Sequence, residues 1–239
     1  MALVEEKLTV VARMHTEFKE KFGIPRQSGL VPSIKGEIHF QGEFCNPDAV
    51  RGIDEFSHLW LLWGFTRARQ ENISLTVAPP RLGGRERKGV FATRSPFRPN
   101  SIGLSSVKLE EVRFGASKEP ILVVSGVDLL DQTPIYDIKP YLPYTDLHPE
   151  AIGGFGKKPG EDELRVIFPE GLKEILPANF RQTVYELLAQ DPRAAYNKKP
   201  DHVFGMNYGG YDVRFTVEGN ILKVKEVVKA DAKGWRKVK

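Results

Sequence analysis

The sequence predicts a mainly β protein: a strand-rich N-terminal barrel over residues 1–148, followed by a smaller α+β domain over residues 149–239. In the first part, short strand-like runs follow one another at close spacing without helical periodicity, which favours a closed sheet or barrel. After about residue 145, a glycine-rich stretch is followed by helical spacing and then by a hairpin pattern.

The strands of the first part are predicted from their apolar patterns. Residues 34–40 place Ile34, Ile38 and Phe40 on one alternating face, as in a half-buried strand. Residues 58–65 form a continuous apolar run, which is typical of a fully buried strand. Further short strands are predicted at 74–78, 89–93, 104–114 and 121–130, with Gly, Pro and Asn between them.

The second part begins with a predicted flexible connection over residues 153–160. A first helix is predicted to end at Pro177, and a second to begin with Asn179 as its cap. Their apolar positions are Leu172, Ile175 and Leu176, and then Phe180, Val184, Leu187 and Leu188. Residues 211–217 and 221–228 are predicted to pair as a hairpin around residues 218–220.

Composition limits the class of protein. Hydrophobic residues make up 41% of the chain, which permits an ordinary core, and no apolar run reaches the length of a membrane span. The first residues carry charge too early for a signal peptide. Cys45 is the single cysteine, and the five histidines are scattered, so neither disulfides nor zinc-type spacing are available. We therefore expect a soluble, cytoplasmic protein without a structural metal.

The net charge of +4 is distributed unevenly. The first 150 residues are neutral, but an arginine-rich segment within them has Glu86 as its only acid. That segment contains Arg81, Arg85, Arg87, Lys88, Arg94 and Arg98. A second basic cluster lies in the last 17 residues, where a solvated charged surface is the favoured interpretation. Basic patches are typical of proteins whose partners carry phosphate.

Two polar stretches, residues 89–105 and 131–141, crowd Arg, Asn, Asp, Lys and Tyr among Pro and Gly. Because proline interrupts helices and central strands, we expect both stretches to form fixed loops that carry binding or chemical groups. The alternative is two ordinary surface turns with solvated charges. Rossmann, Walker and nucleophile-elbow glycine motifs do not occur in the sequence, which argues against the enzyme classes that depend on them.

Several long strings resemble the TrmO-type tRNA methyltransferases. They are Pro25-Arg26-Gln27, Val50-Arg51-Gly52, and residues 56–60, 79–84, 89–105, 137–143 and 188–193 with Tyr196. The resemblance covers nearly the whole chain. It implies a β-barrel that binds S-adenosylmethionine, a smaller C-terminal domain, a homodimer, and N6-methylation of N6-threonylcarbamoyladenosine at tRNA position 37. A non-catalytic RNA-binding barrel and a small-molecule methyltransferase are the alternatives.

The resemblance also implies which residues contact the methyl donor. They are Pro25, Arg26, Gln27, Thr66, Arg67, Arg94, Leu104, Leu130, Asp131, Gln132 and Thr133. Arg26 or Arg94 suits the donor carboxylate, and Asp131 suits its ribose or ammonium. Many relatives have His-Gln in place of Thr66-Arg67 and Gly in place of Gln132, so a left-handed backbone at residue 132 would be strained here.

For the reaction itself, Asp137 is the candidate proton acceptor or hydrogen-bond anchor. Asn100 and Tyr141 are candidates for holding or stacking the base, and Lys139 for neutralising a phosphate or the threonyl carboxylate. Asp137 and Lys139 could instead pair with each other, Tyr141 could be a packed rim residue, and Asn100 could complete a turn.

An anticodon loop is read through splayed bases and phosphate contacts. The phosphate contacts are assigned to Arg81, Arg85, Arg87, Lys88 and Arg98. The second domain is expected to add Arg193, Lys198 and Lys199, or alternatively to support a dimer or the barrel.

Overall fold

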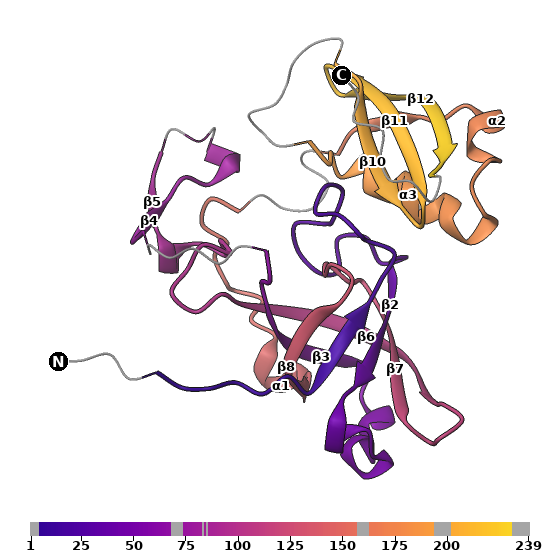
Figure 1. The fold of residues 1–239 in the computed structure, drawn as a ribbon. Helices are drawn as coiled ribbons and strands as arrows, with labels where there is room; N and C mark the ends of the chain where they lie inside the picture. The colour runs from indigo at the N-terminus through magenta and orange to yellow at the C-terminus, as the bar shows by residue number, and fades with distance from the viewer. Residues whose placement is uncertain are drawn as a thin grey trace.

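The computed structural model describes residues 5–67, 74–82, 84, 86–156, 163–193 and 202–230. Its N-terminal part is a closed antiparallel barrel with the strand order β1-β2-β7-β6-β3-β8 (Figure 1). The strands are β1 Ala12–His15, β2 Lys35–Phe40, β3 His58–Gly64, β6 Ile102–Phe114, β7 Pro120–Ser125 and β8 Thr133–Pro140. The predicted barrel is therefore confirmed.

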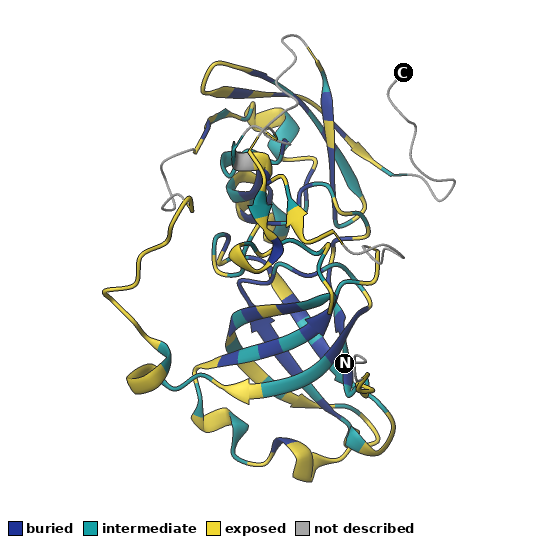
Figure 2. Cartoon of the chain, turned by 90° about the vertical axis from the view of Figure 1, so that its left-hand side faces the viewer, coloured by how far each residue is buried: buried dark blue, intermediate teal, exposed yellow. Residues whose placement is uncertain are grey.

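Alternation along the strands fills the barrel interior. In β3, Leu59, Leu61 and Trp63 are buried, whereas the residues between them face outward and are partly exposed. Met14 of β1 and Ile135 of β8 add to the same interior and are fully buried. Figure 2 shows this as dark blue segments that alternate with lighter ones along the barrel strands.

The predicted loop over residues 131–141 was wrong for most of its length, because β8 lies between β1 and β3 in the closed sheet. Its prolines sit near the strand ends, with Pro134 opposite Arg13 and Pro140 opposite Leu59, where a missing ladder hydrogen bond costs least. A register shift between Leu62 and the following residue of β3 also marks a bulge in this pairing. The other polar stretch likewise runs into β6 from Ile102.

Three strands of the first part, β4 (Thr76–Val77), β5 (Lys88–Gly89) and β7, are shorter than predicted. Strands β4 and β5 pair as a two-stranded sheet, and residues 90–92 form a 3-10 turn rather than a strand. Strand β7 ends at Ser125 because Gly126 turns the chain with a φ of 74°. Further 3-10 turns are η1 Gly42–Phe44, η2 Pro47–Val50, η3 Ile53–Glu55 and η4 Pro80–Leu82, and α1 is Pro143–Asp146.

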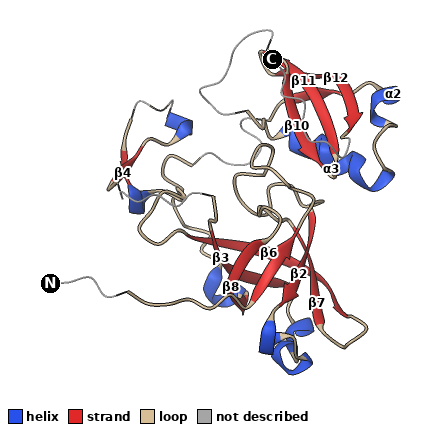
Figure 3. Cartoon of the chain, viewed as in Figure 1, coloured by secondary structure: helices blue, strands red, loops and turns tan. Residues whose placement is uncertain are grey.

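The C-terminal part is a four-stranded sheet in the order β10-β11-β12-β9, with two helices packed on it (Figure 3). The elements are β9 Arg165–Ile167, α2 Glu170–Lys173, α3 Ala178–Ala189, β10 Phe204–Tyr208, β11 Tyr211–Glu218 and β12 Ile221–Lys229. The predicted hairpin and second helix are confirmed. Asn179 is not the cap, because Pro177 precedes the first helical residue and no side chain caps that end. Within the described ranges, no helix is long and apolar enough to cross a membrane.

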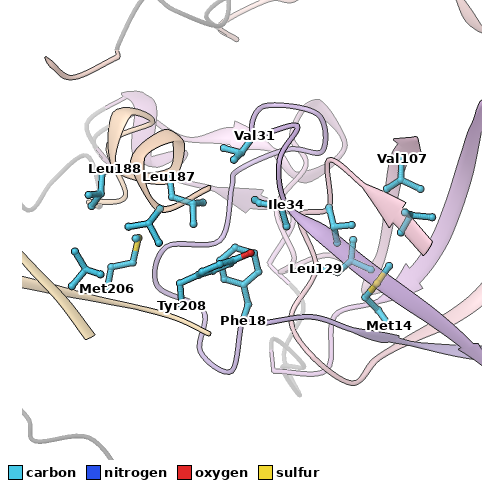
Figure 4. Packing of buried hydrophobic residues seen from close by; sticks show 14 of the residues in the cluster. Met14, Phe18, Val31, Ile34, Val107, Leu129, Leu187, Leu188, Met206 and Tyr208 are labelled. Carbon is cyan, nitrogen blue, oxygen red and sulfur yellow. The ribbon is translucent and has the colours of Figure 1, made fainter. Parts of the chain in front are cut away.

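The loop over residues 16–34, which connects β1 to β2, packs against the C-terminal part. Phe18 is fully buried, and its ring centroid lies 5.2 Å from that of Tyr208 in an edge-on contact (Figure 4). Ser33 donates to Glu186 at 2.6 Å and accepts from Thr183 through its carbonyl oxygen. One hydrophobic cluster therefore runs from the barrel into the C-terminal part, while the predicted boundary at residue 148 stays a prediction.

The two ends of the barrel carry different connections. Loops 16–34, 65–101 and 126–132 leave the end at which Gly64 pairs with Ile102, here called the loop end. The connections over residues 41–57, 115–119 and 141–148 leave the opposite end, near His58 and Pro140. The antiparallel register thus brings residues far apart in the sequence together at the loop end.

Candidate functional site

A cavity of about 690 Å³ lies at the loop end of the barrel. This volume is within the range of small-molecule sites. The inner wall includes Trp63 and Gly103 from neighbouring strands, and the outer wall comes from all three loops of this end. The cavity reaches the outer face of the barrel at Leu104, whose side chain is 52% exposed.

Most of the predicted donor contacts line this cavity. They are Pro25, Arg26, Gln27, Thr66, Arg67, Arg94, Leu104, Leu130 and Thr133. Arg98 and Asn100, which were predicted to face the RNA, belong to the same lining. The barrel register is what brings these segments together, because the ends of β3, β6 and β8 meet here.

The two arginines considered for a carboxylate are engaged differently. Arg94 is exposed at the rim and donates to the side-chain oxygen of Gln27. Arg26 donates to the carbonyl oxygens of Asp191 at 3.4 Å and Arg193 at 3.3 Å. Arg26 therefore bridges the cavity loop to the C-terminal part, whereas Arg94 has the more direct access to a ligand.

Asp131 and Gln132 do not line the cavity. Asp131 pairs with Lys19 at 2.7 Å and accepts from the backbone N–H of Thr16 at 3.1 Å. Partial burial opposes the charge, but these donors outweigh it and lower the pKa of the Asp131 carboxyl. The carboxylate therefore ties two loops together, and its expected contact with the donor stays a prediction.

Gln132 adopts the left-handed backbone considered from the sequence, with a φ of 63°. Its carbonyl oxygen accepts from Arg13 at 2.9 Å, and its side-chain nitrogen lies 3.2 Å from Nδ1 of His15. Like Asp131, it supports the turn before β8 from outside the cavity.

A relay of three side chains at the cavity was not predicted from the sequence. Trp63 donates through Nε1 to the Ser105 hydroxyl at 2.9 Å, and Ser105 donates to Oδ1 of Asp128 at 2.7 Å. Burial raises the pKa of Asp128 to about 6, opposed by the Ser105 hydroxyl, two backbone N–H groups and Arg94. The available signal was that Asp128 is the only charged residue in the apolar run 121–130.

The lining has an uneven charge. Its cations are Lys21, Arg26, Arg67, Arg94 and Arg98. Among the described residues that line it, Asp128 is the single acid. The cavity therefore suits a ligand with anionic groups on most sides and a positive group at one position.

Comparison with known proteins assigns the chain to a family. A model of the tRNA-methyltransferase O N-terminal domain matches residues 13–147, and the TrmO C-terminal domain matches residues 161–230. The chain belongs to the tRNA-methyltransferase O family. The predicted resemblance is therefore confirmed.

Several family members are similar over most of the chain. A protein of Escherichia coli K12, named tRNA (adenine(37)-N6)-methyltransferase, is 45% identical over 77% of this chain and 81% of its own length. A putative S-adenosylmethionine-dependent methyltransferase of Pseudomonas aeruginosa is 39% identical over 90% and 94%. The crystal structure of TrmO from Pseudomonas aeruginosa superposes with a TM-score of 0.75 at 30% identity, covering 94% of this chain and 100% of that one.

Of the four catalytic residues predicted for this chain, only Asn100 is among the residues that line the cavity. Asp137 pairs with Lys139 at 2.9 Å, as the alternative interpretation expected. The ring of Tyr141 lies 5.5 Å from that of Trp60, so it packs on the outer face towards the opposite end. The structure does not gather these four residues at one point.

Asp137 is nevertheless connected to the cavity rim by the strand register. Leu104 of β6 is opposite Leu62 of β3, and Leu62 is opposite Asp137 of β8. The three side chains form a row across the outer face, because directly paired residues point to the same side of a sheet. The Asp137 side chain is 44% exposed. The row therefore runs from Leu104 at the cavity to the carboxylate of Asp137.

The cations assigned to phosphate are mostly held by local contacts. Arg87 donates to Thr76 and Ser74, and Lys88 pairs with Glu86. Arg98 donates to the carbonyl oxygen of Thr93 at 3.0 Å. Arg85, Lys198, Lys199 and the side chain of Arg81 lie outside the described residues.

Arg193 is the clearest departure from the predicted RNA contacts. Its side chain is 6% exposed and makes a two-pronged ion pair with Asp191, at 2.8 and 2.9 Å. Its guanidinium carbon also lies 5.9 Å from the ring centroid of Phe204. These contacts leave it little access to phosphate and favour a structural role next to the carbonyl oxygens that hold Arg26.

Phe91 was not predicted as a functional residue. It lines the cavity, and its side chain is 78% exposed. An exposed ring beside Arg94 and Arg98 is the combination that binds unpaired bases by stacking and phosphates by charge. Its position inside the arginine-rich segment was the available signal.

Proposed function

We propose that this protein transfers a methyl group from S-adenosylmethionine to N6 of adenosine at position 37 of tRNA, with N6-threonylcarbamoyladenosine as the substrate nucleoside. Family membership and relatives that carry the name of this activity support the proposal. The observation that carries it is the cavity, whose lining combines cationic side chains, one acid and an exposed aromatic ring. We place the reaction in the cytoplasm, where mature tRNA is found.

The residues at the cavity fit the donor. Arg94 offers a guanidinium for a carboxylate, and Leu104 and Leu130 offer apolar contact for an adenine. S-adenosylmethionine supplies a methyl carbon that is already electrophilic, so the protein contributes mainly by alignment. Arg26, through its contact with the C-terminal part, and Asp131, through its ion pair with Lys19, restrain the loops that surround the cavity.

The row of Leu104, Leu62 and Asp137 supports a position for the target base. A base lying over the two leucines would have its amino group between the cavity and the carboxylate. In this arrangement Asp137 accepts the proton that N6 must lose, while Lys139 holds the carboxylate or meets the threonyl carboxylate. Asn100, on the cavity lining, is placed to hold a base edge.

RNA outside the target nucleotide is proposed to contact the arginine-rich segment. Phe91 offers a stacking surface, and Arg87, Lys88 and Arg98 offer positive charge. A double substitution, Arg87→Ala with Arg98→Ala, is expected to weaken tRNA binding and flatten its salt dependence. An unchanged affinity and salt slope would remove these residues from the interface.

We further propose that the protein acts as a homodimer. Exposed apolar side chains at the opposite end of the barrel support this: Tyr144 of α1 is 86% exposed, and Leu147, which follows α1, is 61% exposed. Sedimentation at several concentrations measures the state directly. A monomer at all concentrations used in activity assays would contradict the dimer.

The function is tested by mass spectrometry of tRNA nucleosides from a strain lacking this gene. We expect N6-threonylcarbamoyladenosine to accumulate without its N6-methyl group, and the wild-type gene to restore the methyl. Full methylation in the deletion strain would refute the proposal. Donor binding in the absence of any tRNA methylation would instead favour a small-molecule methyltransferase, and a protein that binds RNA but no donor would be a non-catalytic barrel.

A further inference from the structure

Asp128 is held rigidly at the cavity. Its Oδ1 accepts from the Ser105 hydroxyl, which is itself fixed by the indole N–H of Trp63. Ser105 is 1% exposed and Trp63 7% exposed, so the supporting pair lies in the core while the carboxylate lines the cavity. The backbone N–H of Ser28 also hydrogen-bonds to this carboxylate. Such support is typical of groups that position a ligand.

The charge pattern of the lining singles out the same residue. Five cationic side chains line the cavity and repel positive ligand groups, and Asp128 is the one acid among the described lining residues. The other carboxylates considered from the sequence are directed elsewhere, Asp131 to Lys19 and Asp137 to Lys139. A ligand with a net positive group would therefore find one countercharge in this cavity.

We propose that Asp128 is the donor-binding residue that receives the positive charge of S-adenosylmethionine, held in place by Ser105 and Trp63. The inference rests on the proposed donor and adds a residue and a role to it. The donor carries two positive groups, the sulfonium and the ammonium. Either group would place a cation beside the carboxylate of Asp128. No bond is made or broken at Asp128 in this role.

The pKa of Asp128, raised by burial to about 6, is consistent with this role and supplies a second readout. A bound cation favours the ionised carboxylate, so donor affinity should fall once the pH drops below about 6 and a proton must first leave. Arg94 is the charged side chain that acts on Asp128, and the other cations that line the same cavity are Lys21, Arg26, Arg67 and Arg98. Lysine and arginine ordinarily keep their charge from pH 5 to 7, as do the amino and carboxyl groups of an amino acid.

The experiment is calorimetric titration of the full chain at neutral pH with three probes. These are S-adenosylmethionine, S-adenosylhomocysteine, which keeps the ammonium but lacks the sulfonium, and methylthioadenosine, which keeps the nucleoside but has neither charge. Wild type is compared with Asp128→Asn, in which the amide oxygen can still accept from Ser105. The control is Asp54→Asn, an exposed acid on η3 at the opposite end.

We expect Asp128→Asn to weaken S-adenosylmethionine binding by about 10- to 100-fold, as for a lost hydrogen bond to a charged group, and to leave methylthioadenosine unchanged. Equal weakening of S-adenosylhomocysteine assigns the ammonium, and unchanged binding of it assigns the sulfonium. Equal affinity of wild type and variant for S-adenosylmethionine overturns the proposal, as does equal weakening of methylthioadenosine, which would indicate a ribose contact.

Titration of the wild type with the donor at pH 7 and pH 5 needs no variant. Its result therefore does not depend on whether Asp128→Asn folds. We expect the dissociation constant for S-adenosylmethionine to rise roughly tenfold over this interval, following the proton linkage of one group. A flat profile overturns the proposal. If the wild type binds no donor at any pH, the proposed function itself fails, whereas donor binding that ignores Asp128 removes only this inference.

Discussion

The two ends of the barrel contain similar residue types but leave them in different states. At the opposite end, Arg51 pairs with Asp48, and the indole of Trp60 donates to Asp146 at 2.8 Å. At the loop end, Arg94 and Asp128 line an open cavity together with an exposed Phe91. The difference is that the charged and aromatic groups of the loop end line one cavity, whereas those of the opposite end pair with each other or, like Tyr144, are exposed.

The largest expected effect would show whether the chemistry extends beyond the loop end. Replacing Asp137 by Asn should lower the single-turnover methylation rate by about 100-fold, because general-base assistance is commonly worth this much. Donor affinity should stay unchanged, since Asp137 lies outside the cavity. Rapid-quench kinetics with nucleoside analysis measures the rate. A wild-type rate in this variant would confine the chemistry to the cavity and let the proton leave to solvent.

The next effect compares one arginine from each end. Arg94→Ala should weaken S-adenosylmethionine binding by roughly tenfold or more, because a charge-assisted hydrogen bond to the donor carboxylate is lost. Arg51→Ala, whose side chain is 79% exposed at the opposite end, should have no effect. Calorimetry on both variants measures this. Equal affinities for the two would contradict the assignment of the donor to the loop end.

Two exposed phenylalanines provide a matched test of RNA binding. Phe91→Ala should weaken binding of an anticodon stem-loop by roughly tenfold, as for one stacked base. Phe114→Ala removes a ring that is 53% exposed at the opposite end of β6 and should leave affinity unchanged. Fluorescence anisotropy gives both values. If the second variant loses affinity and the first does not, the RNA lies at the other end.

The smallest effect concerns backbone strain. Gln132 and Lys118 both have a φ of 63°, one beside the cavity loops and one in the turn at the opposite end. Replacement by glycine should raise the free energy of unfolding by about 0.5 to 1 kcal/mol in each case, as relief of strain exceeds the added unfolded-state entropy. Urea denaturation measures this. A loss of stability in Gln132→Gly alone would mean that its contact with His15 outweighs the strain.

Alternating patterns predicted β2 and the β11–β12 hairpin, whose two faces differ clearly. The continuous apolar run at 58–65 correctly predicted a strand, β3, but not its burial, because Trp60 and Leu62 face outward and are partly exposed. Prediction from the sequence pattern failed at β8, where Pro134 and Pro140 indicated a loop, because closing the barrel between β1 and β3 outweighs the local preference of two terminal prolines. The same tertiary pairing made β1, a strand of only four residues, part of the barrel.

For the site, family resemblance led to residues that the barrel register then brought together, Gln27, Arg94 and Leu104 among them. It did not predict which charged groups are already paired. Asp131 is engaged by Lys19, and Arg193 is buried against Asp191, because those partners come from loop conformations that a linear sequence does not display. The role of Asp128 could not be predicted from the sequence, because its partners Ser105 and Trp63 come from other strands.

The most direct test of the donor site is a crystal structure of the protein with S-adenosylhomocysteine. We expect the ligand at the loop end, with its amino-acid carboxylate near Arg94 and its nucleoside against Leu104 and Leu130. A ligand bound at the opposite end, or on the C-terminal sheet with this cavity empty, would contradict the account.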